Sequence, residues 1–121
     1  AILHTHSLDA VSLAEVRGGA ALELAGLELL KAFPGPSTHE RSVVLPVVDN
    51  DQDMDRLAAR AEAALEGLGA ATWGYVIRGH GLYAWGASLD EAARHVEAFR
   101  YLLALEWRLY ATGPARRPQG D

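Results

Sequence analysis

The apolar residues of this chain recur with two different periods, one typical of strands and the other typical of helices. Alternating or β-branched runs predict strands at residues 1–6, 21–26, 42–48, 72–79 and 81–86. Apolar spacing of i, i+3, i+4 and i+7 predicts helices at about 9–17, 26–33, 54–68 and 88–112. The alternation of strands and helices indicates one layered α/β structure without an internal linker.

Residues at the ends of these segments support the assignment. Gly18–Gly19 ends the first helix, Asp49–Asp53 supplies a cap and acidic first turn to the third, and Ser88–Glu91 is a capping box for the last. Pro46 places its strand near a sheet edge or at a bulge. The last two strands form either a tight hairpin or one strand broken around His80. The apolar face of the last helix is expected to contain Ala92, Val96, Phe99, Leu103 and Tyr110.

Composition narrows the class of protein. The chain has 121 residues, of which 50% are hydrophobic and 22% charged, as in one soluble globular domain. Its net charge of −5 and lack of a basic stripe argue against a nucleic-acid or anionic-membrane partner. With no cysteine, disulfides and thiolate zinc sites are excluded, and a reducing cytoplasm is the simplest location. No apolar run is long enough to cross a membrane.

The start of the sequence lies inside an apolar strand, with no methionine, turn or cap before it. We therefore expect residues 1–121 to be the C-terminal portion of a single domain that belongs to a longer polypeptide. Residues 113–121 are turn-rich and are expected to form a loose tail.

Two histidines one residue apart are the first candidates for chemistry. Side chains alternate along a strand, so His4 and His6 are predicted to share one face. Burying two titratable rings together is costly unless something favours both neutral forms, as a bound metal does. A third ligand could come from His80, which lies between Gly79 and Gly81. Three histidines and an open fourth position are typical of a catalytic zinc, although hydrogen-bonded strand histidines and an exposed turn histidine are alternatives.

A second candidate pair lies in the predicted helix at 26–33. Glu28 and Lys31 are three residues apart and would be neighbours on one helix face. They form either a surface ion pair or a general acid/base with a nearby cation, and position alone does not decide between the two. Of the remaining histidines, His95 is expected to be structural, and His39 is left open as a residue that supports the metal ligands.

Five short motifs occur in the order, and at nearly the spacing, of one family. They are HTHS at 4–7, GLELLKAFPG at 26–35, THE at 38–40, LPVVDNDQD at 45–53 and RGHGLYAWG at 78–86. On these residues the chain resembles the methylthioribulose-1-phosphate dehydratases of methionine salvage, within the class II aldolase/adducin superfamily. The resemblance runs to about residue 110, and the glycine-flanked histidine followed by Tyr-x-Trp-Gly is its most specific part.

The resemblance implies a fold, a metal and roles for individual residues. The fold would be a three-layer α/β/α sandwich around a mixed β-sheet, with the N-terminal part and its phosphate-binding loop absent from this chain. One Zn²⁺ per chain would be held by His4, His6 and His80, and Glu28 would be the catalytic acid/base. Independently of the resemblance, Lys31 is expected to meet the substrate phosphate or Glu28, because it is the chain's only lysine. The family also implies a homo-oligomer, most simply a homotetramer.

The reaction implied by the resemblance is a metal-dependent dehydration. A hydro-lyase of this family removes water from 5-methylthioribulose 1-phosphate, a phosphorylated ketose, to give 2,3-diketo-5-methylthiopentyl 1-phosphate. One alternative is a sugar-phosphate aldolase or 4-epimerase of the same superfamily, which would share the metal ligands. Glu28 favours the dehydratase, because the sibling aldolases take their acid from a position before the H-x-H. Another alternative is a non-catalytic adducin-type binding domain, which would be expected to have lost metal ligands that this chain retains.

Overall fold

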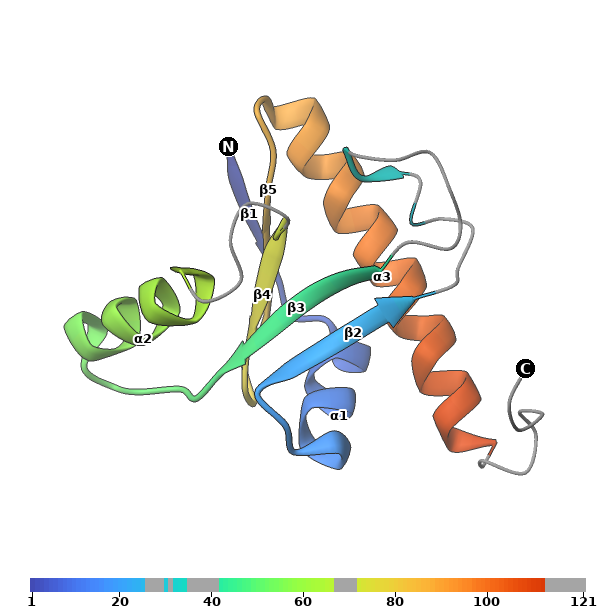
Figure 1. The fold of residues 1–121 in the computed structure, drawn as a ribbon, viewed down its shortest axis with the longest axis horizontal. Helices are drawn as coiled ribbons and strands as arrows, with labels where there is room; N and C mark the ends of the chain where they lie inside the picture. Colours follow the sequence, from blue (N-terminus) through green and yellow to red (C-terminus); the bar gives the residue numbers. More distant parts are fainter. Residues whose placement is uncertain (26–29, 31, 35–41, 67–71, 113–121) are drawn as a thin grey trace.

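The computed structural model describes residues 1–25, 30, 32–34, 42–66 and 72–112. Within these ranges the chain forms a five-stranded mixed sheet with the strand order β1-β5-β4-β3-β2 (Figure 1). Only the central pair β3 and β4 is parallel, and the other neighbouring strands are antiparallel. The strands are β1 (Ile2–Thr5), β2 (Ala21–Ala25), β3 (Ser42–Val48), β4 (Gly74–Ile77) and β5 (Gly81–Trp85). All five predicted strands are present, and the last two form a hairpin.

Capping residues mark the starts of the first and last helices, and the expected stop at Gly18 and capping box at Ser88–Glu91 are present. The Ser7 side chain accepts a hydrogen bond from the Ala10 N–H, and Gly18 ends the first helix in the left-handed conformation. Ser88 caps the last helix by accepting from the Glu91 N–H, while the Glu91 carboxylate accepts from the Ala87 N–H. The helices are α1 (Leu8–Arg17), α2 (Met54–Glu66) and α3 (Leu89–Ala111).

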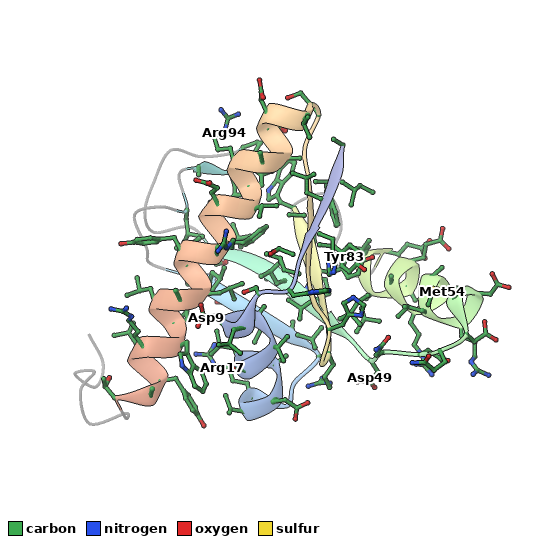
Figure 2. All side chains as sticks on the ribbon, turned by 180° about the vertical axis from the view of Figure 1, so that it is seen from behind. Asp9, Arg17, Asp49, Met54, Tyr83 and Arg94 are labelled. Atoms are coloured by element: carbon green, nitrogen blue, oxygen red, sulfur yellow. The ribbon has the colours of Figure 1, made fainter. Side chains whose placement is uncertain are left out.

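Helices α1 and α3 cover one face of the sheet and enclose the main core. Figure 2 shows both helices in front of the strands, with Asp9 and Arg17 marking α1. An ion pair joins the two helices, since the Arg17 Nη2 lies 2.8 Å from Oε2 of the buried Glu106. The largest fully buried apolar side chains of the core include Phe99, Leu13, Leu22, Leu24, Leu45, Leu82, Leu102 and Leu103.

Helix α2 packs against β3 and extends away from the rest of the chain (Figure 1). Val47 and Val76 belong to the main core, so alternation along the strands points their neighbours Val48 and Ile77 to the opposite face. Both of these neighbours are buried, as is Ala61 of α2. The mixed α/β sheet is thus as predicted, whereas a complete three-layer sandwich stays a prediction.

Two predictions about individual residues can be compared with the structure. Strand β3 lies next to the edge strand β2, so Pro46 is near the sheet edge as predicted, although it is not on the edge strand itself. The Val47 N–H donates to the Ala20 carbonyl on the β2 side of the strand, so the nitrogen of Pro46 faces β4. Pairing of β3 with β4 begins only at Val47. Proline is tolerated there because no ladder hydrogen bond is required of it. Tyr110 lies near the end of α3 and is 47% exposed. Its assignment to the apolar face of this helix was therefore wrong.

The predicted helix at 26–33 falls mostly outside the described residues. Of this segment the structure describes Leu30, residues 32 and 33 and the following proline. Leu30 and Phe33 are buried in the main core, and the ring of Phe33 contacts Phe99 at 4.5 Å between centroids. No helix in the described part of the chain has the length and hydropathy of a membrane span.

Candidate metal centre

The pairing of β1 with β5 brings the two ends of the candidate site together. His4 pairs with Tyr83 and Thr5 with Leu82, so the first strand ends beside the β4–β5 turn that carries His80. His6 follows directly after β1 and remains on the same side as His4. Residues separated by more than seventy positions in the sequence therefore become neighbours.

Three imidazole rings converge at this point. The ring centroids are 4.8 Å apart for His4 and His6, 5.0 Å for His4 and His80, and 5.3 Å for His6 and His80. Each ring offers a nitrogen, and these nitrogens all lie within 4.8 Å of one another. A tetrahedral zinc about 2.0–2.1 Å from each nitrogen needs nitrogens about 3.4 Å apart, which small side-chain rotations would provide. Among the described residues, no other group of three or more potential ligands converges in this way.

The hydrogen bond of His4 determines which of its nitrogens is available. Its Nδ1 lies 3.0 Å from the Leu82 carbonyl oxygen. Because a carbonyl only accepts, Nδ1 must carry the proton and donate it, which leaves the lone pair on Nε2. A backbone carbonyl behind a metal-binding histidine is the common way to fix this tautomer. A donor set of three imidazoles fits a divalent transition metal such as zinc.

Two glycines let the backbone form the site, each for a different reason. The His80 N–H donates to the Ile77 carbonyl at 2.9 Å, closing a tight turn in which Gly79 has φ +73°. Gly81 is needed because β1 passes very close to it. A Cβ at Gly81 would collide with the Thr5 carbonyl oxygen and would lie 3.0 Å from His4 Cε1 and 3.2 Å from His6 Cα. Gly79 thus allows the turn, and Gly81 allows the close approach of β1.

Arg78 ties the same turn to the rest of the protein. Its Nη1 donates to the Ala14 carbonyl at 2.7 Å and its Nη2 to the Gly19 carbonyl at 3.0 Å. Its Nε donates to Asp49 Oδ1 at 2.9 Å. The guanidinium thus links the turn to the C-terminal end of α1 and to the loop after β3. This anchor fixes the backbone two residues before His80.

Aromatic rings line up behind His4 across the sheet. The ring of Tyr83 stacks on His4 with centroids 4.2 Å apart and planes 20° apart. Tyr75 stacks on the other side of Tyr83 at 5.2 Å and 10°. Burial raises the pKa of Tyr75, and the neighbouring Tyr83 raises it further, so this phenol stays neutral at physiological pH.

The sequence argument assumed that the histidine pair is buried, and the structure does not bear this out. His4 and His6 are exposed and His80 is half-buried. The cost of burying two neutral rings is therefore not the reason for a metal here, and that part of the argument was wrong. The convergence of three nitrogens is the observation on which a metal site depends, and metal binding itself stays a prediction.

The remaining candidates are placed differently. Glu28, Lys31 and His39 lie outside the described residues. His95 is fully buried, and its Nδ1 donates to the Trp85 carbonyl at 2.7 Å, which agrees with a structural role.

Sequence reasoning missed the residues that support the ligands. Neither the contact of Tyr83 with His4 nor the three bonds of Arg78 has a local sequence signal, because each depends on strand register or on a distant loop. The Tyr-x-Trp alternation after Gly81 is the one pattern that could have placed Tyr83 on the histidine face.

Comparison with known proteins identifies a family over most of the chain. Residues 1–107 match the family described as Class II Aldolase and Adducin N-terminal domain. A methylthioribulose-1-phosphate dehydratase of Xanthomonas campestris pv. campestris (strain 8004) is 50% identical over 109 residues, which cover 89% of this chain and 49% of that protein. A protein of the same name from Pseudomonas aeruginosa (strain LESB58) is 49% identical over 109 residues, covering 90% of this chain and 53% of that protein. The chain thus spans about half the length of the curated relatives that it matches.

Proposed function

Because this chain belongs to the class II aldolase and adducin family, we propose that it forms the metal-binding part of a zinc-dependent hydro-lyase. The reaction would be dehydration of 5-methylthioribulose 1-phosphate to 2,3-diketo-5-methylthiopentyl 1-phosphate, a step of methionine salvage. The observation that carries the proposal is the convergence of His4, His6 and His80, whose nitrogens lie within 4.8 Å of one another. The name shared by its relatives supports the choice of substrate.

The three histidines would hold one zinc ion and leave one position open toward the substrate. The bound ion would supply a Lewis acid that stabilises negative charge developing on the ketone oxygen. His4 would contribute Nε2, because its Nδ1 is used by the Leu82 carbonyl. His6 is exposed, and among the described residues its ring contacts only the rings of His4 and His80. It can therefore rotate to complete the ligand set.

Glu28 would act as the general base and acid of the dehydration. Its carboxylate would take the proton from the carbon next to the ketone and would return it to the departing hydroxyl, so that water leaves. Replacing Glu28 by Gln keeps the size of the side chain and removes the base. We expect Glu28→Gln to retain the metal and to lose about 10²–10⁴-fold in kcat, the usual value of a positioned acid/base. A Glu28→Gln variant with the parent rate would contradict this role.

Lys31 is proposed to contact the substrate phosphate or the Glu28 carboxylate. Lys31→Met should raise KM if the ammonium binds phosphate. Unchanged KM and kcat would assign it to the solvent-exposed surface.

One assay separates the proposed reaction from its alternatives. The full polypeptide that carries this sequence is purified, its zinc content is measured, and turnover of methylthioribulose 1-phosphate is compared with that of fuculose 1-phosphate. The proposal predicts about one zinc per chain and turnover of the first substrate. Cleavage of fuculose 1-phosphate would favour an aldolase, and a metal-free protein inactive on both would favour an adducin-type binding domain. The same preparation tests the proposed homotetramer by light scattering.

A further inference from the structure

The rings of Tyr75, Tyr83 and His4 form a stacked row across the sheet, and His4 is one of the proposed metal ligands. Strand register places Tyr75 opposite Tyr83 and Tyr83 opposite His4, on three neighbouring strands. The planes are nearly parallel, at 10° for the two tyrosines and 20° for Tyr83 and His4. Directly opposed residues of this kind are the pairs that stabilise antiparallel strands.

The stacked row restrains the ring of His4 in a way that the rings of His6 and His80 do not share. An imidazole side chain has two torsions, and a ring must satisfy both before its nitrogen points at a metal. The bond from Nδ1 to the Leu82 carbonyl directs one edge of the ring, and the face of Tyr83 at 4.2 Å limits its rotation. Within the described residues, no corresponding side-chain hydrogen bond is found for His6 or His80, and Tyr83 lies 6.3 Å from the His80 ring at 43°, a tilted arrangement rather than a stack.

We propose that Tyr83 is a positioning residue that holds the His4 ring ready for metal binding. It acts through the face of its ring and does not touch the metal, while Tyr75 supports it from behind. His4 is then the pre-oriented ligand on which the ion first binds, and His6 and His80 close around it. The inference rests on the metal site of the proposed function, but it concerns a residue to which that function assigns no role.

The stack has an electronic consequence as well as a steric one. Binding of a divalent cation makes an imidazole electron-poor, and the electron-rich face of a phenol ring attracts such a group. Phenylalanine has a similar face, whereas an aliphatic side chain of similar volume has none. Tyr83→Phe should therefore preserve the effect and Tyr83→Leu should remove it.

The test measures metal affinity in the full polypeptide that carries this chain. Zn²⁺ dissociation constants are obtained by competition with a chromophoric chelator, and the visible spectrum of the Co²⁺ form reports the ligand geometry. We expect Tyr83→Phe to stay within about threefold of the parent, and Tyr83→Leu to bind zinc about 10–100-fold more weakly with an altered Co²⁺ spectrum. Tyr75→Leu should have a smaller effect than Tyr83→Leu, since Tyr75 does not contact His4.

A matched control uses a stacked tyrosine elsewhere. Tyr110 stacks on Trp107 at 5.8 Å and 20°, near the end of α3 and outside the site. Tyr110→Leu makes the same chemical change and should leave metal affinity unaltered. If Tyr83→Leu does not fold, as judged by circular dichroism of the apoprotein, Tyr83→Met replaces it, because its flexible side chain fills space without an aromatic face.

Each result decides the question. Parent-like zinc affinity and Co²⁺ spectrum in folded Tyr83→Leu would overturn the proposal, while the metal site would stand. Equal losses in Tyr83→Phe and Tyr83→Leu would also overturn it, because the hydroxyl rather than the ring face would be responsible. If neither the Leu nor the Met variant folds, Tyr83 is a structural residue and the proposal is overturned. A parent protein that binds no metal would instead contradict the proposed function.

Discussion

Replacing Gly81 by Ala should destroy the proposed metal site through a single methyl group. The added Cβ would overlap the Thr5 carbonyl oxygen and would lie 3.2 Å from His6 Cα and 3.0 Å from His4 Cε1. Two of these three atoms belong to the backbone of the segment that carries the histidines. The overlap can therefore be relieved only by moving this segment away from β5.

The size of that movement can be estimated from ordinary contact distances. Relaxing the overlap with the Thr5 oxygen to a normal separation of about 3.5 Å requires a shift of roughly 1 Å. Metal–nitrogen distances tolerate deviations of only about 0.2 Å. His4 and His6 would move with the backbone while His80 stays on its turn, so side-chain rotations would have to close an additional gap of roughly 1 Å between the nitrogens. We expect zinc affinity to fall by at least about 100-fold, more than the usual effect of losing one supporting contact.

Two other glycines provide controls for the backbone effect of alanine. Gly79 and Gly18 have φ of +73° and +63°, and a Cβ at either would have no atom within 4 Å. Alanine at each should cost about 1–2 kcal/mol of stability because of its left-handed conformation. Neither substitution pushes β1 away, so Gly18→Ala should bind zinc as the parent does and Gly79→Ala should lose far less affinity than Gly81→Ala. Zinc competition titrations and thermal melts are made on all three variants. Parent-like affinity in Gly81→Ala would refute the reasoning.

Two further predictions concern the support of the site and the start of α2. Arg78→Lys cannot bridge two carbonyls and a carboxylate at once, so unfolding by urea should show a loss of about 1–3 kcal/mol. Asp49→Asn, at a carboxylate side chain that is 72% exposed, should cost less than about 1 kcal/mol; equal losses would contradict the central role of the guanidinium. The hydrogen bond from Arg56 holds the pKa of Asp51 below its usual value of 3.8. The contribution of the Asp51 carboxylate to folding stability is therefore fully present above about pH 4 and is lost as the pH falls through the lowered pKa. Asp51→Asn should therefore lower the melting temperature more at pH 7 than at pH 3, and a pH-independent difference would disprove the assignment.

Local sequence signals predicted the elements of this fold well. Gly18 ends the first helix and Ser88 caps the last one as expected, and the β-branched residues of 42–48 form a strand. These features depend on neighbours a few positions away, which a single sequence displays directly. Tyr110 was misplaced because helical periodicity marks a face but does not show where the neighbouring sheet ends.

The grouping of the three histidines could be predicted from the sequence, but the residues that support them could not. A period of two placed His4 and His6 together, and the glycines around His80 indicated a turn. The collision at Gly81 and the stack on His4 depend on the register of β1 against β5. This register brings together residues far apart in the sequence, such as His4 and Leu82, which are hydrogen-bonded although they are 78 positions apart. The expectation that the rings would be buried failed because alternation gives the face of a strand but not what covers that face.

The most direct test of the account is the coordination of the metal itself. X-ray absorption at the zinc edge of the zinc-loaded full polypeptide should show three imidazole nitrogens about 2.0–2.1 Å from the ion, with a light atom in the fourth position. The variants His4→Ala, His6→Ala and His80→Ala should each lose the tightly bound zinc, whereas His95→Ala should lose stability but keep a site for the ion. A zinc site that persists unchanged in all three variants, or a spectrum without imidazole ligands, would contradict the central claim that these three histidines bind the metal.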